Sequence, residues 1–264
     1  MFGPQLDVLF AATALHLDAA APQRPWMVRD GLRLTPPYWI RTSLLTHQLR
    51  VDDTTLDKAW RPLFGWCNLR RLFICPGEIS GRRRPLSESV KWDLFREIVA
   101  GVPPEATSLY RAVQDGRKVV GRRGGPAERH KTLDKVPLQN LEDVTDYYRR
   151  QQALVEVMRR DGRLRPVSEL CPGDPYVRRG KETDIGIAIV EDGQPLLFRK
   201  GRHRLAAAHA LGLEEVPCTP LLVSARWLRS LAGGRVRLRE AGRALDGYLR
   251  SLGSGNGATP SGSD

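Results

Sequence analysis

The stretch TDIGIAIVEDGQPLLFRKG (residues 183–201) contains two short apolar runs on either side of an Asp-Gly pair. Asp-Gly readily adopts the positive φ values that a tight hairpin turn requires. The stretch therefore predicts two antiparallel strands, Ile185–Val190 and Pro195–Lys200, joined by a turn at Glu191-Asp192-Gly193.

An alanine-rich helix and a further strand complete this region. The helix is predicted over Leu205–Leu211, and Gly212 ends it. The strand follows in EEVPCTPLLVS (residues 214–224). Its two prolines are expected only at a sheet edge or at strand ends, because proline cannot donate to the ladder. Residues 182–224 are therefore predicted to form a hairpin-helix-strand unit.

The clearest helix is predicted in LEDVTDYYRRQQALVEVMRRDGRL (residues 141–164). Its apolar residues recur at helical spacing, at Val144, Tyr147 or Tyr148, Leu154, Val155 and Met158. Acids come early and arginines late, as the helix dipole favours, and Asp161-Gly162 ends the helix. SESVKWDLFREIVAG (residues 87–101) predicts a second amphipathic helix.

These patterns divide the chain into four segments. Residues 1–85 are predicted to be mixed short strands and loops, and residues 86–163 a helical region. Residues 164–226 are predicted to form a small α/β domain, and residues 227–264 a basic helix followed by a disordered tail. A short helix, Ala225–Leu231, is predicted at the boundary between these two segments. The predicted fold class is α+β, with the α/β domain in the C-terminal half behind a mainly helical region.

The charge balance favours anionic partners. The chain carries 42 Lys and Arg against 30 Asp and Glu, a net charge of +12. Such an excess suits nucleic acid or nucleotides, and the alternative is an arginine-rich chain with solvated faces. No apolar run approaches the roughly 20 residues of a membrane span, so no membrane partner is predicted. Four scattered cysteines without a CxxC pair indicate reduced thiols and a cytoplasmic location.

Positive charge gathers where the second strand of the hairpin turns into the helix, in Gly201-Arg202-His203-Arg204. Glycine lets the backbone approach a ligand, and the free N–H groups of a helix N-terminus attract anions. Cations at that end oppose the helix dipole unless an anion lies among them. The pattern therefore predicts a phosphate-binding turn. The alternative is that these side chains extend into solvent or pair with nearby glutamates.

The stretch DGQPLLFRKGRHRLAAAHALGLEEVPCTPLLV (residues 192–223) resembles the ParB/sulfiredoxin superfamily. The signature is a strand, a GxxR-type motif opening an alanine-rich helix, and Leu-Gly-x-x-x-x-Pro before another strand. The matching residues are Gly201, His203, Arg204, Ala207, Leu211, Gly212 and Pro217. The resemblance implies a small α/β domain in which Gly201, His203 and Arg204 contact nucleotide phosphates. Members of the superfamily include partition proteins that hydrolyse CTP, sulfiredoxins that use ATP, and free-serine kinases.

Arg202 departs from that family pattern. It occupies the position of the catalytic cysteine of sulfiredoxins and of the metal-associated glutamate of partition proteins, so neither chemistry carries over directly. The sequence therefore favours a protein that binds a nucleotide (ATP or CTP, with Mg²⁺) or another phosphorylated small molecule, and that acts as an NTP hydrolase or kinase if it is an enzyme. The alternatives are a nucleic-acid-binding protein that holds backbone phosphates and a non-catalytic interaction module.

Two acids precede the first strand of the hairpin. Glu182 and Asp184 are expected to return beside Gly201 on the antiparallel strand, where they would hold a magnesium ion and serve as the catalytic groups. The alternative is that they are ordinary loop acids. The turn acids Glu191 and Asp192 are expected about 20 Å away, at the far end of the hairpin. Arg82–Arg84 and Arg122-Arg123 are weaker candidates for nucleic-acid contacts.

Overall fold

The computed structural model describes residues 26–28, 34, 36–49, 72–75, 83–116, 132–133, 136–138, 140–171, 184–198, 200–233 and 238–253. The chain is a mixed α/β protein that divides into two compact units. The sheet unit comprises Met1–Arg84, Thr183–Gly201 and Glu214–Asp264. The helical unit comprises Pro85–Glu182 and Arg202–Leu213.

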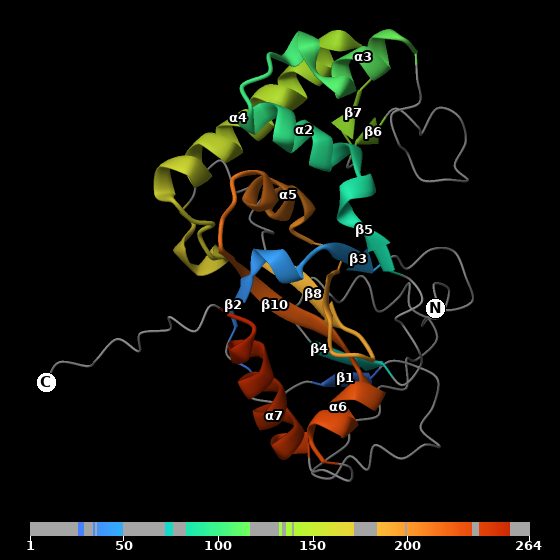
Figure 1. The fold of residues 1–264 in the computed structure, drawn as a ribbon, viewed down its shortest axis with the longest axis vertical. Helices are drawn as coiled ribbons and strands as arrows, with labels where there is room; N and C mark the ends of the chain where they lie inside the picture. Colours follow the sequence, from blue (N-terminus) through green and yellow to red (C-terminus); the bar gives the residue numbers. More distant parts are fainter. Residues whose placement is uncertain are drawn as a thin grey trace, which may run out of the picture. The chain divides into compact units, whose positions relative to one another are not determined.

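The sheet unit is built on a mixed sheet whose described strands follow the order β1-β4-β10-β8-β9-β3-β5, with β2 paired to the first half of β10 (Figure 1). Strand β10 runs parallel to β4 and β8, whereas β8 and β9 form an antiparallel hairpin. The strands are β1 (Trp26–Val28), β2 (Tyr38–Arg41), β3 (His47–Leu49), β4 (Leu72–Cys75), β5 (Arg83–Pro85), β8 (Ile185–Ile189), β9 (Pro195–Leu197) and β10 (Glu215–Ser224).

The predicted hairpin is present, with its turn where Asp-Gly placed it. Gly193 has φ +84°, the left-handed conformation that glycine adopts without strain. Strand β8 has the sequence IGIAI and every residue of it is buried. A Cβ on Gly186 would lie 2.5 Å from Leu221 Cδ1 and 2.6 Å from the Phe198 carbonyl oxygen, so the close approach of its neighbours requires glycine there.

Strand β10 differs from its prediction. It lies in the centre of the sheet, so the expectation of an edge strand, or of prolines at strand ends, is wrong. Both prolines lie at a limit or an irregularity of the ladder with β8, although Pro217 is also paired with Trp39 of β2. Pro217 precedes Cys218, the first residue paired with β8, and Pro220 lies at a register shift in that ladder. Prolines are accommodated at such irregularities because no ladder hydrogen bond is lost.

Helices α6 (Ala225–Leu231) and α7 (Leu238–Ser251) belong to the sheet unit, as does the single-turn 3₁₀ helix η1 (Thr42–Leu44). The bounds of α6 are those predicted, and the Ser224 side chain accepts a hydrogen bond from the Trp227 backbone N–H. Helix α6 contacts β10, and α7 contacts α6 and β2. Helix α7 buries Ala241, Leu245 and Leu249 on one face, an amphipathic pattern that fits a helix covering a sheet.

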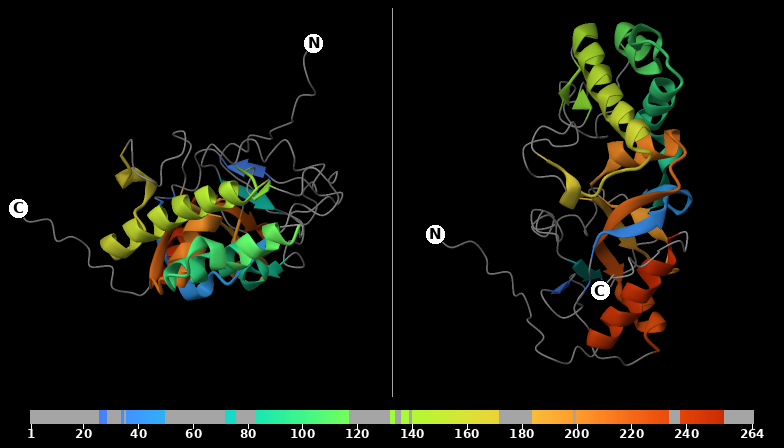
Figure 2. Two further views of the ribbon diagram at one scale, coloured as in Figure 1. Left: turned by 90° about the horizontal axis from the view of Figure 1, so that it is seen from above. Right: turned by 90° about the vertical axis from the view of Figure 1, so that its left-hand side faces the viewer.

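The helical unit consists of α2, α3, α4 and α5 with short connecting elements. Its members are η4 (Leu86–Glu88), α2 (Val90–Val99), η5 (Pro104–Ala106), α3 (Ser108–Gln114), the β6–β7 hairpin (Thr132–Leu133 and Val136–Pro137), α4 (Leu141–Asp161), η7 (Val167–Glu169) and α5 (Arg202–Ala210). Helix α2 contacts the other three helices, and α4 contacts α3 and α5. Figure 2 shows α4 alongside α2 and α3 in both views.

Helix α4 confirms the clearest helix prediction. Asn140 and Asp143 form a reciprocal capping box at its start, and Gly162 ends it in the left-handed conformation with φ 64°. The residues predicted from helical spacing are all buried, and Gln151 is buried with them. In the part of the chain that the structure describes, no helix combines the length and hydropathy needed to cross a bilayer.

Candidate functional site

The basic motif forms the first turn of α5. Arg202, His203 and Arg204 are its first three residues, all half-buried, and the turn contains no acid. The first N–H groups of a helix lack intrahelical partners, and positive side chains beside them are unfavourable for the helix dipole. This turn therefore presents cationic groups and backbone donors together, an arrangement that an anion would stabilise.

His203 is held from inside the helical unit. Its Nε2 lies 2.6 Å from the hydroxyl oxygen of Tyr147 on α4. Its ring also contacts Phe95 on α2 edge to face, with centroids 6.1 Å apart. Tyr147 and Phe95 are both fully buried, so one side of the imidazole packs against two buried aromatic side chains.

The other end of α5 is attached to the same helix α2. His209 contacts Trp92 with ring centroids 4.5 Å apart. His209 is half-buried. Phe95 and Trp92 are three residues apart and therefore neighbours on α2. Between the two histidines, Leu205 and Ala206–Ala208 are buried, so the alanine-rich sequence lets α5 pack closely.

Sequence reasoning identified His203 but missed Tyr147 as its partner. Tyr147 was noted only as an alternative to Tyr148 for one apolar position of α4. The two residues are 56 positions apart, so no local spacing connects them. The available signal was general: a tyrosine hydroxyl on a buried helix face needs a hydrogen-bond partner.

Within the sheet unit, Gly201 has φ +82°, and a Cβ on it would lie 2.8 Å from Ile185 Cα. The structure thus brings the start of β8 against Gly201, as the hairpin required. Asp184 directly precedes Ile185 and is 8% exposed. Glu182 lies outside the described residues, so its proposed role with Asp184 stays a prediction. Among the residues that the structure describes, no three His, Cys, Asp or Glu gather as a metal site would require.

The far end of the hairpin is occupied by structural contacts. Arg83 donates to Asp192 Oδ2 and to Gln194 Oε1, each at 2.6 Å. The Tyr248 hydroxyl donates to the Gly193 carbonyl oxygen at 2.6 Å. Arg83, a weak nucleic-acid candidate in the sequence, therefore fastens the hairpin turn. Arg82, Arg122 and Arg123 lie outside the described residues.

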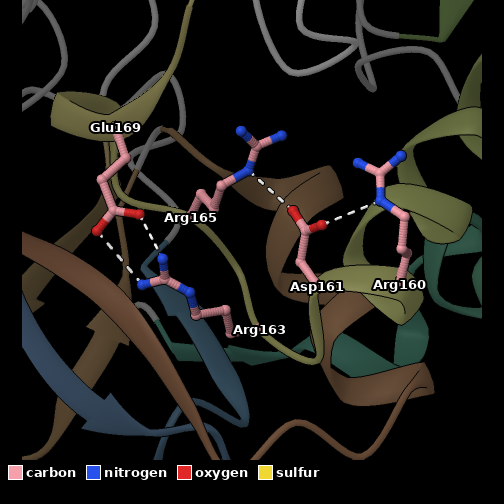
Figure 3. Close-up of polar contacts among 5 residues, drawn as sticks. All are labelled: Arg160, Asp161, Arg163, Arg165 and Glu169. Atoms are coloured by element: carbon pink, nitrogen blue, oxygen red, sulfur yellow. Dashed lines mark hydrogen bonds and ion pairs between the residues drawn. The ribbon is translucent and has the colours of Figure 1, made fainter.

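Arginines also gather after α4, where Figure 3 shows two groups of ion pairs. Asp161 lies 3.2 Å from Arg160 Nε and 2.9 Å from Arg165 Nε. Arg163 donates two hydrogen bonds to Glu169, at 3.3 and 2.6 Å. These pairs join the C-terminal end of α4 to the segment that follows it. Their positive charge is thus partly balanced by Asp161 and Glu169.

The chain matches no family model, no curated protein and no solved structure.

Proposed function

We propose that the first turn of α5 binds the phosphate groups of a nucleotide or of another phosphorylated small molecule. The observation that carries the proposal is the composition of that turn: two arginines and a histidine, no acid, and a histidine ring fixed by Tyr147. The resemblance of GRHR and its surroundings to the ParB/sulfiredoxin superfamily supports the same ligand. It also supports a ParB-like arrangement as the finer description of the fold.

Each group has a chemical role in this proposal. An arginine guanidinium matches two phosphate oxygens with a planar pair of donors, and the backbone N–H groups of the turn add neutral hydrogen bonds. His203 contributes a donor from one ring nitrogen. Gly201, Glu182 and Asp184 enter from the sequence alone, the glycine as a further phosphate contact and the acids as magnesium ligands.

Catalysis would require more than phosphate binding. Phosphoryl transfer needs positioning and charge neutralisation, usually with Mg²⁺ held by a carboxylate. The motif offers no carboxylate because Arg202 stands at its second position. If the protein turns over ATP or CTP, Glu182 and Asp184 are the acids that we propose for the metal.

The test is calorimetric titration of the full chain with ATP and CTP, with and without Mg²⁺. We expect Arg204→Ala to weaken binding by about tenfold or more, because a charge-assisted hydrogen bond is lost. Arg149→Ala is the matched control: its side chain is 71% exposed and pairs only loosely with Asp146 at 3.6 Å. We expect that control to stay within about threefold of the unmodified protein.

Equal losses in the two variants would contradict the proposal and indicate diffuse electrostatic attraction. Absence of any binding would contradict it as well and favour the interaction module. The second candidate function is nucleic-acid binding, which the net charge of +12 favours.

A further inference from the structure

Helices α6 and α7 of the sheet unit carry positive charge that the proposed function does not use. Residues 225–251, which contain both helices, include seven arginines, two acids and no lysine. The segment thus supplies a net charge of +5 out of the +12 of the whole chain. The two helices pack against each other (Figure 1). Because arginine is not deprotonated in proteins, this charge persists at every physiological pH.

The exposed face of α7 gathers three of these arginines. Arg239, Arg243 and Arg250 are all exposed, while the apolar residues of the helix are buried on the opposite side. The arginines follow one another after four and seven residues, a spacing that brings side chains to one side of an α-helix. They form a stripe about 16 Å long at the rise of an α-helix. We call this stripe the arginine face of α7.

Two arginines of this face carry charge that no described acid neutralises. Arg250 is engaged within the fold: its Nε donates to Asp246 Oδ2 at 2.9 Å, and its guanidinium carbon lies 5.9 Å from the centroid of the Tyr38 ring. In the described part of the chain, Arg239 and Arg243 form no ion pair and no side-chain hydrogen bond. These two guanidinium groups therefore face solvent with their charge uncompensated.

Helix α6 adds two arginines of the same kind. Arg226 is exposed and Arg229 is half-buried, and neither has an ion-pair partner among the described residues. The Nε of Arg229 is enclosed and has no hydrogen-bond partner. A cation that has lost part of its hydration without gaining a partner is unfavourable. An anion that reaches this guanidinium would therefore stabilise it.

We propose that the arginine face of α7, together with the arginines of α6, binds the phosphate backbone of a nucleic-acid duplex without regard to its sequence. An arginine guanidinium matches two phosphate oxygens with a planar pair of donors, and contacts to phosphates position a protein on a duplex without reading bases. This surface goes beyond the proposed function, since α6 and α7 belong to the sheet unit and the phosphate-binding turn of α5 to the helical unit. It gives the second candidate function a location.

The packing of α7 favours a duplex over a membrane surface. A basic amphipathic helix that binds lipid inserts its apolar face among the acyl chains. In α7 that face is already buried, with Ala241, Leu245 and Leu249 at most 1% exposed. Among the described residues, Leu231 at 36% is the only large apolar side chain classed as exposed. The charged face alone is therefore available to a partner.

The aromatic residues of the two helices favour a duplex over a single strand. Proteins that hold single strands stack the bases on exposed aromatic rings. Trp227 is 9% exposed, and its ring contacts that of Tyr248 with centroids 4.7 Å apart. The Tyr248 hydroxyl is bonded to the Gly193 carbonyl oxygen. Both rings are thus occupied within the fold, and phosphate contacts remain for recognition.

The test is fluorescence anisotropy of labelled duplex DNA and duplex RNA, each in two unrelated sequences, titrated with the full chain between 50 and 200 mM salt. The variant is Arg239→Ala with Arg243→Ala. The matched control is Arg96→Ala with Arg149→Ala, which removes the same charge from exposed positions of the helical unit. For the duplex that binds, we expect the slope of log affinity against log salt to shrink by about one unit for each α7 arginine removed. The control should keep the original slope, and the two sequences should behave alike.

Three outcomes would overturn the inference. Equal losses in variant and control would show diffuse attraction by the net charge. Absence of binding to either duplex at 50 mM salt would show that the face holds no backbone. Tighter binding to vesicles of phosphatidylserine and phosphatidylcholine than to a duplex, lost in the α7 variant, would make the partner a membrane surface.

The experiment is independent of the nucleotide site. The α7 variant should bind ATP as the unmodified protein does, so failure of ATP binding leaves this inference standing, and failure of duplex binding leaves the proposed function standing. Circular dichroism should show an unchanged fold, because Arg239 and Arg243 make no described side-chain contact that holds the helix. If the alanine variant does not fold, Arg239→Gln with Arg243→Gln, which keeps most of each apolar stem, replaces it and should show the same loss of slope.

Discussion

At the residue scale, two aspartates of the sheet unit owe their charge state to fixed partners. Burial raises the pKa of Asp192, but hydrogen bonds from the Gln194 backbone N–H and from Arg83 outweigh it and leave that pKa below its usual value. Burial likewise raises the pKa of Asp246, but hydrogen bonds from Arg250 and Tyr38 outweigh this effect. The pKa of Asp246 is therefore also below its usual value. A lowered pKa in the folded state means that the charged carboxylate stabilises the fold.

This linkage predicts an acid-sensitive contribution from the Arg83–Asp192 pair. The stabilisation is fully present above the unfolded pKa of an aspartate, about 3.9, and is lost as the pH falls through the lower folded value. We expect the Arg83→Ala variant to be less stable than the unmodified protein at pH 7. On acidification, its free energy of unfolding should fall by less than that of the unmodified protein. Urea denaturation between pH 7 and pH 2.5 measures both.

The control for this prediction is Arg226→Ala, which removes an exposed arginine of α6. Its stability curve should run parallel to that of the unmodified protein at every pH. A parallel curve for Arg83→Ala would show that Asp192 does not depend on Arg83 for its lowered pKa.

At the element scale, local patterns predicted α4, α6 and the β8–β9 hairpin because their signals are local. Helical spacing identified the buried face of α4, and Asp-Gly identified the turn with Gly193 at φ +84°. The central position of β10 was not predictable, because its neighbours β2 and β4 come from the first 75 residues. The Tyr147–His203 contact was missed for the same reason. The phosphate role of the motif and the four-segment division stay predictions.

The hairpin turn gives a prediction at this scale. Gly193→Ala should destabilise the protein by two effects: strain at positive φ, and a clash, since the new Cβ would lie 2.6 Å from Trp227 Nε1. Gly212→Ala is the control, because Gly212 also has positive φ but its Cβ would meet nothing within 4 Å. Gly193→Ala should therefore cost at least about 1 kcal/mol more in urea denaturation. Equal costs would show that Trp227 moves aside freely.

At the scale of the whole molecule, the excess of positive charge is the property that separates the two candidate functions. A net charge of +12 attracts any polyanion, whereas the first turn of α5 is proposed as a local site for a few phosphate groups. A nucleotide occupies only a few positive groups. A nucleic acid covers many, and each neutralised phosphate releases a counterion.

The salt dependence of binding therefore separates the two functions. We expect ATP affinity to fall shallowly between 50 and 200 mM salt, and duplex DNA affinity, if measurable, to fall by about a thousandfold or more if six or more phosphates are neutralised. Arg204→Ala should reduce ATP binding and leave the DNA slope almost unchanged. A specific, high-affinity DNA complex that depends strongly on Arg204 would favour the nucleic-acid function instead.

The helical unit is assembled from two stretches of chain separated by residues 183–201. Because synthesis runs from the N-terminus, α2, α3 and α4 are made before α5. The rate of synthesis is about 5–20 residues per second. Residues 183–213 therefore take roughly 2–6 s to follow. During that interval the side chains that later contact α5, among them Phe95 and Tyr147, belong to a unit that still lacks one helix. The nascent chain thus passes through a stage in which these aromatic surfaces are open to chaperones, and release from that stage awaits the synthesis of the alanine-rich helix.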